Sequence, residues 1–495
     1  MIILYIIKRE KSSNNKEVIY MLIRFSVENF LSFDKEQEIS MIPGNIRGRD
    51  EHLINNNHIK ILKLGTIYGA NSAGKSNLIK AINFAKKIIM GDIPLQSSNM
   101  FCKINKSNEI RPSKFEFEFT KEGKYYAYGF TMILRERKIL SEWLYEINAK
   151  DQSPIFERET DIGRLDFYIK VSGENEMRLN TYKLDFKENT NSLFLNEINR
   201  NKSFSSESIL YLFNQVYRWF TNDLRVIYPE QPIIKFDGFY GENNTKRINN
   251  IINLFDTGIS KIKIEKISYE KLMDELTLEE AEEFMNRYKE VVKDLQNLSN
   301  GSIGSVRNDK KSISNKIQEI EVGVSLRTRD SFYNMSGNIN GEPNISTIRT
   351  EHNKSFFDYN FKEESDGTRR LFDLLDILLS ADSPEGLNRV YVIDELERSL
   401  HPKLTYRFIE LFIKILEKKN VQLIFTTHES TIMDQELLRR DEIWFVERNK
   451  DNYSRIYSLD RFQERYDKKL NKSYLEGRYG AIPIFKEFSF EEDLI

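Results

Sequence analysis

The feature that most constrains the fold of this chain is a glycine-rich loop with the spacing G-x-x-x-x-G-K-S, from Gly69 to Ser76. A mostly apolar, β-branched run, IKILKLGTIYG, leads into the loop, as expected for a buried parallel strand. After Lys75, apolar residues recur at helical spacing. Glycines let backbone N–H groups close around phosphate oxygens, and a helix that starts there adds its positive end. The sequence therefore predicts a nucleotide-phosphate site between a strand and a helix.

Individual positions of this loop have expected tasks. Lys75 is predicted to reach the β- and γ-phosphates and to take part in catalysis, and the Ser76 hydroxyl is predicted to hold Mg²⁺. A chance glycine-rich turn is the alternative, and the strand and helix patterns on either side argue against it. The residues of the loop that are predicted to bind the nucleotide are Gly69, Asn71, Ser72, Ala73, Gly74, Lys75, Ser76 and Asn77.

Two further motifs follow apolar strands in the C-terminal part of the chain. The strand RVYVID ends in Asp394 and Glu395. Asp394 is placed to hold the metal, usually through water, and Glu395 to orient and deprotonate the attacking water. His428, in TTHES after the next apolar strand, can contact the γ-phosphate and report its presence. The alternative interpretations are that Asp394 and Glu395 only cap a strand and that His428 is a structural histidine. The phosphate loop in the same chain argues against both.

The stretch ESDGTRRL favours a particular assembly. Ser365, Gly367 and Thr368 precede a predicted helix, and a serine hydroxyl, a glycine N–H and the helix dipole together make an anion site. One protein does not need two such sites for one γ-phosphate, whereas two protomers facing head to tail do. Each would then lay its Ser365 and Gly367 on the nucleotide held by the other. A simple helix cap is the alternative.

Composition is that of an ordinary globular protein with about two or three domains. The chain has 495 residues, of which 40% are hydrophobic and 30% charged, and its formal net charge of -2 gives no global drive toward nucleic acid. The apolar run MIILYII at the N-terminus is too short to span a bilayer, so no membrane association is expected. The single cysteine, Cys102, excludes a disulfide framework and makes a reducing cytoplasm the simplest location.

The nucleotide-binding fold is predicted to be divided by an insertion. Strand patterns, the loop and an antiparallel β meander place its first half in residues 21–190. Residues 191–345 are predicted to be a mainly helical insertion or arm, and residues 346–495 return to an α/β pattern that supplies the second half. Residues 1–20 are interpreted as an N-terminal extension, or as a loosely held extra strand.

Within the insertion, a charged amphipathic stretch from Tyr269 to Leu298 predicts an arm of roughly 40 Å. The polar stretch after it, SNGSIGSVRNDKKSISN, is typical of a loop. Its lysines could touch DNA phosphates, but a solvated loop is the favoured interpretation. The tail motif YLEGRYGAIP is interpreted as a packed C-terminal turn rather than as a functional contact.

As a set, these motifs resemble those of the ABC-type ATPase heads of the SMC/RecF/OLD group, with SDGT at the signature position and ERSLHP in the D-loop. More narrowly, the chain resembles the RloA/AbiL-type family of bacterial ATPases found among phage-defence genes. The resemblance implies an α/β fold, a P-loop ABC-type ATPase head with an antiparallel β subdomain and a mainly helical insertion. The segments that carry it, between Met21 and about Pro483, are VENFLSF, GANSAGKSNL, ESDGTRRLFDLL, VIDELERSLHP, QLIFTTHES, RRDEIWFVER and YLEGRYGAIP.

The resemblance also implies roles for residues, with ATP and Mg²⁺ as cofactors. The position of the family's Q-loop glutamine stays open, with Gln96 as a candidate. The residues matched to family roles are Lys75 and Ser76 for nucleotide and Mg²⁺, Asp394 for the metal aspartate, Glu395 for the catalytic glutamate, His428 for the switch histidine, and Ser365 and Gly367 for the signature that acts on a second subunit's nucleotide.

The favoured function is an ATPase, converting ATP and water to ADP and phosphate, that dimerises head to tail around ATP and gates a partner in anti-phage defence by abortive infection. By resemblance, the partner would be a separately encoded effector, such as a nuclease of the RloB or TOPRIM type. The alternatives are a RecF/SMC-like ATPase in DNA repair or maintenance and a nucleotide-gated scaffold with little hydrolysis. Higher oligomers and contact with nucleic acid stay open.

Overall fold

The computed structural model describes most of the chain, and the loop predicted after Gly301 lies outside the described residues. Those residues are 2–6, 19–46, 48–56, 59–148, 151–202, 204–229, 242–301, 321–328, 332–338, 342–379, 388–462 and 469–483. None of the described helices combines the length and the apolar character that a membrane crossing requires.

The chain forms two compact units, each built from segments far apart in the sequence. Unit 1 contains residues 1–15, 230–383 and 398–404. Unit 2 contains residues 16–229, 384–397 and 405–495. The chain therefore leaves unit 2, builds most of unit 1, and returns to finish unit 2.

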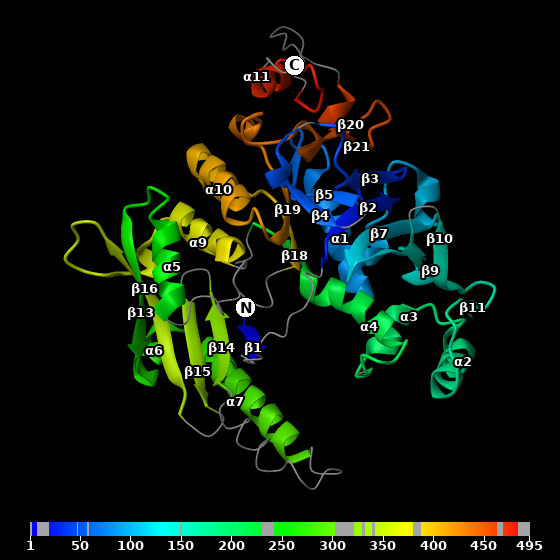
Figure 1. Ribbon diagram of the computed structural model, residues 1–495, viewed down its shortest axis with the longest axis horizontal. Helices are drawn as coiled ribbons and strands as arrows, with labels where there is room; N and C mark the ends of the chain where they lie inside the picture. The colour runs from blue at the N-terminus through cyan, green and yellow to red at the C-terminus, as the bar shows by residue number, and fades with distance from the viewer. Residues whose placement is uncertain are drawn as a thin grey trace, which may run out of the picture. The chain divides into compact units, whose positions relative to one another are not determined.

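Unit 2 contains a six-stranded sheet whose neighbours are parallel except at one edge (Figure 1). Because β12, β18, β19, β6 and β20 run parallel, their carboxyl ends share one edge of the sheet. The strand interiors are almost continuously buried, which explains why they appear as apolar runs in the sequence. In spatial order the strands are β12 (Leu224–Ile227), β18 (Asn388–Ile393), β19 (Asn420–Thr426), β6 (Leu64–Tyr68), β20 (Ile443–Arg448) and the antiparallel β21 (Ser454–Ser458).

A second sheet of unit 2 is the predicted antiparallel meander, extended by two strands from the start of the unit. Its alternating residues pack an aromatic core, in which Phe119 stacks on Trp219 with ring centroids 4.4 Å apart. In spatial order its strands are β11 (Arg164–Phe167), β10 (Gln152–Glu159), β9 (Lys138–Ile147), β8 (Lys124–Ile133), β7 (Ser113–Lys121), β2 (Leu22–Glu28) and β3 (Gln37–Ser40). The remaining strands of the unit are β4 (Leu53–Asn56) and β5 (Ile59–Leu62), which pair with each other.

One buried glutamine joins the two sheets of unit 2. The side chain of Gln422, on β19, accepts a hydrogen bond from the Leu22 N–H at 3.0 Å and donates to the carbonyls of Leu22 and Leu62 at 3.0 and 2.9 Å. Since a buried polar group must be satisfied, this arrangement sets the register between β2 and the strands of the parallel sheet. The helices of unit 2 are α1 (Lys75–Ile89), α2 (Glu174–Phe186), α3 (Phe194–Asn199), α4 (Tyr211–Arg218) and α11 (Leu470–Leu475), and α10 (Pro402–Ile415) begins in unit 1.

Unit 1 contains an antiparallel sheet that the sequence patterns do not predict. Its longest pairing joins β13 to β16, whose residues are more than 75 positions apart in the chain, for example Ile267 and Ile345. In spatial order the strands are β1 (Ile2–Ile6), β14 (Glu321–Arg327), β15 (Phe332–Asn338), β16 (Asn344–His352) and β13 (Ile259–Ile267), and β17 (Tyr359–Asn360) pairs with β16. The helices of the unit are α5 (Glu242–Ile252), α6 (Tyr269–Glu275), α7 (Leu278–Gly301) and α9 (Asp366–Leu379).

The predicted arm is two helices, and its apolar face is used inside unit 1. A capping box breaks the stretch: the Glu280 N–H donates to Thr277 Oγ1 at 3.3 Å, and the Thr277 N–H donates to Glu280 Oε2 at 3.1 Å. Apolar residues of α6 and α7 pack with residues of the sheet in one buried cluster. Its members include Leu272, Phe284, Tyr288, Val291, Val324, Tyr333 and Met335.

Candidate nucleotide-binding site

The glycine-rich loop connects β6 to α1 in unit 2, as the sequence predicts. A Cβ atom at Gly69 would overlap the carbonyl oxygen of Val446 on β20, so a side chain is excluded there. Gly74 has a φ of 116°, and a Cβ atom there would overlap the hydroxyls of Ser454 and Ser32. Both motif glycines are therefore required by the backbone path of the loop.

Side chains from outside the loop hold its backbone in place. Ser454 Oγ donates to the carbonyl of Ala73 at 2.5 Å, and Arg448 Nε donates to the carbonyl of Ser72 at 3.1 Å. At the start of α1, Asn77 Nδ2 donates to Ser32 Oγ at 2.9 Å. A loop whose carbonyls are anchored in this way can present backbone N–H groups to an anion, which is how such loops bind phosphate.

Lys75 lies at the centre of this site, with 5% of its surface exposed. Its amine donates to the carbonyls of Gly69 and Ala70 at 2.8 and 3.1 Å, and it lies 3.5 Å from His428 Nδ1. Burial lowers the pKa of Lys75 to about 8, although nearby carboxylates, Glu397 first among them, oppose the shift. Phosphate oxygens would have to replace the two carbonyls as acceptors for Lys75, so this cation is held within reach of a ligand.

Asp394, at the end of β18, meets Ser76 from the start of α1. Asp394 Oδ1 accepts hydrogen bonds from Ser76 Oγ at 3.1 Å and from Thr426 Oγ1 at 2.6 Å. A hydroxyl and a carboxylate are hard oxygen donors of the kind that Mg²⁺ takes together with phosphate oxygens and water. The structure therefore brings together the two residues predicted to hold the metal, and their donor chemistry fits Mg²⁺.

Glu395 occupies a strained backbone position beside Asp394. Its φ is 49°, in the left-handed region that residues with a Cβ rarely adopt, and its N–H donates to Thr426 Oγ1 at 2.8 Å. Such strain persists where the surrounding structure requires it, and it is common at functional sites. His428 follows β19 at the same sheet edge, where burial and the charge of Lys75 lower its pKa. The predicted acid, histidine and lysine thus come from the carboxyl edge of one sheet.

Glu397 belongs to this site, although the sequence analysis gave it no role beyond its place at the start of the D-loop motif ERSLHP. Its Oε1 accepts the backbone N–H of His428 at 2.6 Å. Its Oε2 is buried and has no hydrogen-bond partner in the described part of the chain, and burial raises the pKa of this carboxyl. The only available signal was position, since Glu397 comes three residues after Asp394 in DELERSL.

The signature residues belong to unit 1, at the start of α9. Ser365 Oγ accepts the N–H of Thr368 at 3.1 Å and lies 2.9 Å from the Thr368 hydroxyl, which is a helix-cap arrangement. A Cβ atom at Gly367 would lie 2.6 Å from the carbonyl oxygen of Ser399 in the predicted D-loop. Ser365, Gly367 and Thr368 are thus grouped with the D-loop, and the residues of the phosphate loop lie in unit 2.

The Q-loop candidate and the C-terminal tail motif both lie in unit 2. Gln96, the Q-loop candidate, is exposed in a short 3-10 helix, Leu95–Asn99. The tail motif packs behind the phosphate loop, because the ring of Tyr474 lies 5.8 Å from that of Tyr68 and its hydroxyl donates to the Ala481 carbonyl at 3.1 Å. The tail is therefore a packed turn that supports β6.

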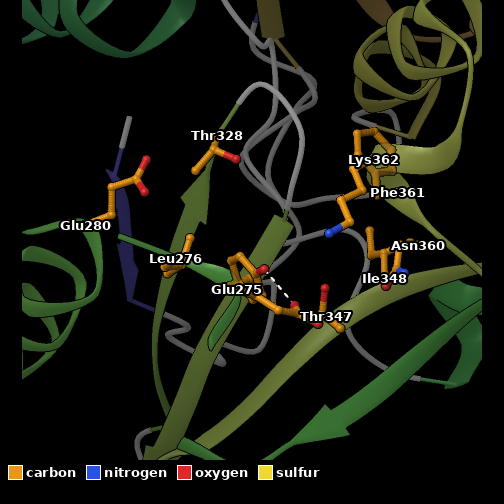
Figure 2. Close-up of a pocket in the computed structure, with 10 residues that line it drawn as sticks. Glu275, Leu276, Glu280, Thr328, Thr347, Ile348, Asn360, Phe361 and Lys362 are labelled. Carbon is orange, nitrogen blue, oxygen red and sulfur yellow. Dashed lines mark hydrogen bonds between the residues drawn. The ribbon is translucent and has the colours of Figure 1, made fainter. Parts of the chain in front are cut away.

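Unit 1 has a pocket of about 320 Å³, which contains none of the predicted site residues (Figure 2). Tyr333 lines it and donates its hydroxyl to Glu275 Oε2 at 2.7 Å. Its lining includes Asn360, Phe361 and Lys362, which come shortly before Ser365 in the sequence. The other lining residues are Leu276, Glu280, Thr328, Thr347 and Ile348.

Fold and site together define the class of protein. A parallel sheet carries a glycine-rich phosphate loop, an Asp-Glu pair and a histidine at one edge, so the chain has an ABC-type P-loop ATPase fold. The family model described as "AAA domain, putative AbiEii toxin, Type IV TA system" matches residues 66–434. The chain belongs to this family.

Three solved structures are similar to the chain at a distance, and no curated protein matches it. The SMC head bound to the C-winged helix domain of ScpA has 13% sequence identity and a TM-score of 0.38, with 88% of this chain and 97% of that chain covered. The SMC head domain with an extended coiled coil from Pyrococcus furiosus, bound to the C-terminal domain of ScpA, has 14% identity and a TM-score of 0.39, with 93% and 99% covered. The SMC head domain from Thermotoga maritima has 15% identity and a TM-score of 0.33, with 88% and 98% covered.

Proposed function

We propose that this chain binds ATP with Mg²⁺ and hydrolyses it between two copies that meet head to tail. The observation that carries the proposal is the contact between the Ser76 hydroxyl and the Asp394 carboxylate, 3.1 Å apart at the mouth of a phosphate loop. The hydroxyl comes from the start of α1 and the carboxylate from the end of β18, and the adjacent Glu395 is held at a φ of 49°. A phosphate loop alone serves many functions, whereas this metal pair next to a strained acid suits phosphoanhydride hydrolysis.

Each residue has a task that its position supports. Lys75 would leave the Gly69 and Ala70 carbonyls for the β- and γ-phosphates, while Ser76 and Asp394 would hold the metal. Bound Mg²⁺ would offset the charge of those phosphates. Glu395 would take a proton from the attacking water. The nearby backbone N–H groups of the loop would stay fixed by Ser454 and Arg448 while the terminal phosphate departs.

The second copy would complete the site through its signature. Ser365, Gly367 and Thr368 form the N-terminal end of a 14-residue helix, where a hydroxyl and the positive end of the helix dipole favour an anion. In each site of the dimer, one copy would supply the loop and the other the signature. ATP would then hold the dimer closed, and hydrolysis would release it, because the two states differ in contacts to the γ-phosphate.

The biological role that we propose is gating of a separately encoded effector in phage defence, in the cytoplasm. The family description, which names an AbiEii toxin of a type IV toxin–antitoxin system, supports a defence role. The RloA/AbiL-type assignment and an RloB- or TOPRIM-type nuclease as partner stay proposals on the motifs above. A role in DNA maintenance predicts instead that DNA alone stimulates turnover, and a pure scaffold predicts negligible turnover.

Mixing two inactive variants tests the shared site. Lys75→Ala should fail to bind ATP, and Ser365→Arg should bind ATP without hydrolysing it. In a mixed dimer, the intact loop of the Ser365→Arg copy meets the intact signature of the Lys75→Ala copy. An equimolar mixture should therefore recover roughly a quarter of the wild-type rate, since half of the dimers carry one complete site. Phosphate release measures turnover, and thermal melting checks that each variant folds.

Two results would contradict the proposal. If Ser365→Arg alone hydrolyses ATP at the wild-type rate, the signature does not act on the nucleotide. If the mixture stays as inactive as its components, the two residues do not serve one site from different copies.

A further inference from the structure

The turn between β16 and β17 in unit 1 carries two adjacent, strongly exposed phenylalanines. Phe356 leaves 96% of its surface exposed and Phe357 leaves 82%. Single exposed apolar residues are ordinary on protein surfaces, but two neighbouring aromatic rings in water are costly. Each ring buries about 150–250 Å² when it is covered. A surface of this kind points to a binding partner.

This turn is held in a defined conformation by its flanking residues. Ser355 Oγ donates to the Phe357 carbonyl at 2.8 Å, and Lys263 Nζ donates to the Asp358 carboxylate at 2.9 Å. The rings of His352 and Tyr359 lie 4.7 Å apart at its base. Because the turn is already ordered, its phenylalanines can be covered with little loss of conformational entropy.

The same turn lies close to the signature. Glu364, the residue before Ser365, receives hydrogen bonds from Thr350 and His352 at the end of β16, the second across 2.7 Å. Phe356 comes four positions after His352, a span of at most about 14 Å. The phenylalanines and the signature therefore occupy the same end of β16.

We propose that Phe356 and Phe357 form part of the face through which two copies of this chain meet. This inference rests on the proposed function, in which the signature of one copy faces the phosphate loop of the other. Residues close to the signature, including the turn that carries Phe356 and Phe357, would then lie against the second copy or near it. The occupant of the phenylalanine surface is a second copy of this chain.

Charge and area support this choice of occupant. Glu363 and Asp366, on either side of the signature serine, are exposed acids, and Asp366 has 63% of its side chain exposed. Arg448, which is exposed and donates to the Ser72 carbonyl of the phosphate loop, is a cation that such acids could face. Covering both phenylalanines in both copies would bury roughly 600 Å² or more, a large share of the roughly 1,600 Å² of a standard interface.

The test uses the full-length chain with Glu395→Gln, which should trap the ATP-bound dimer. We expect Phe356→Ala/Phe357→Ala in this background to raise the dimer dissociation constant at least about a hundredfold with ATP and Mg²⁺ present. Replacing both by leucine should recover most of the affinity, because the apolar area returns. Leu184→Ala is the matched control, since Leu184 has 73% of its surface exposed on α2. Sedimentation measures the dimer, and a fluorescent ATP analogue measures binding to the monomer.

The outcomes separate this inference from the proposed function. If Glu395→Gln dimerises with ATP and the double alanine variant dimerises equally well, the inference is wrong and the proposed function stands. A Leu184→Ala loss as large as that of the double variant would likewise overturn the inference, because the effect would not be specific. If Glu395→Gln stays monomeric with ATP at every concentration tested, the proposed function itself fails.

Discussion

Glu397 illustrates how one side chain can control a neighbour through the backbone. Its carboxylate holds the N–H of His428 at 2.6 Å, while the other oxygen of the carboxylate is buried without a partner among the described residues. Burying an oxygen without a hydrogen bond costs free energy of folding. The hydrogen bond that the other oxygen accepts from the His428 N–H offsets part of that cost. Glu397 is therefore a positioning residue for His428, and the turn after β19 depends on it.

Replacing Glu397 should slow turnover more than it weakens binding. We expect Glu397→Ala to lower kcat by about ten- to a hundredfold with a small change in KM, because a hydrogen bond to a charged group is worth about 1.5–3 kcal/mol. Glu397→Gln keeps an acceptor for the His428 N–H and should recover much of the rate. Steady-state kinetics with ATP measures both constants.

A neighbouring glutamate provides the control for this prediction. Glu429 also accepts a local backbone hydrogen bond, from the Thr431 N–H at 2.9 Å, but it does not hold His428. Glu429→Ala should leave kcat unchanged. Equal losses in Glu397→Gln and Glu397→Ala would show that the charge, and not the hydrogen bond to His428, matters.

At the scale of elements, Lys63 holds the end of α10 from within the core. Its amine donates to the Leu416 carbonyl at 2.9 Å and also contacts the Glu417 carbonyl, while only 1% of Lys63 is exposed. The last carbonyls of a helix lack partners in the helix, and a lysine there satisfies them. Burial nevertheless lowers the pKa of Lys63 to about 8, because the interior disfavours the charged amine.

This lowered pKa predicts how stability changes with pH. Between the folded pKa near 8 and the unfolded pKa of 10.5, the unfolded chain binds more protons at Lys63 than the folded chain does. The contribution of Lys63 to the free energy of unfolding therefore rises with pH across that window. Relative to Lys63→Met, the wild type should gain about 2 kcal/mol in unfolding free energy from pH 8 to pH 10. Chemical denaturation at each pH measures the difference.

Lys60 is the control for this measurement, because it lies on β5 near Lys63 and 55% of its side chain is exposed. The change with pH in the difference from the wild type should be larger for Lys63→Met than for Lys60→Met. If the difference for Lys63→Met changes no more than that for Lys60→Met, the amine of Lys63 is not desolvated in the folded chain.

On the scale of the whole molecule, the N-terminal segment pairs with one unit and the phosphate loop lies in the other. Strand β1 pairs with β14 in unit 1, with Ile2 opposite Leu326. Deleting residues 1–20 should therefore leave ATP affinity unchanged, as measured by titration with a fluorescent ATP analogue. Deleting only residues 1–15 is the control, because Ile19 is packed in the core of unit 2. Loss of ATP binding in both deletions would refute the prediction.

The site was predictable from the sequence to the extent that its chemistry is local. The phosphate loop needs glycines at fixed spacing, and the residues after buried parallel strands must gather at one edge of a sheet, so Ser76, Asp394 and His428 could be placed together. The sequence analysis missed the break between α6 and α7, although Thr277 and Glu280 have the spacing of a capping box. The role of Glu397 was not predictable, because it depends on where the backbone of His428 turns.

What the sequence by itself determined is the strand–loop–helix with the spacing of a phosphate loop, together with the acidic residues at a neighbouring strand end. Backbone geometry and short-range periodicity dictate both. Only the tertiary structure decided the sheet of unit 1, since β13 pairs with β16 across a long sequence separation that no local pattern records. The exposure of Phe356 and Phe357 was also beyond sequence reasoning. Whether an aromatic residue is buried or left in water depends on the packing of the whole unit.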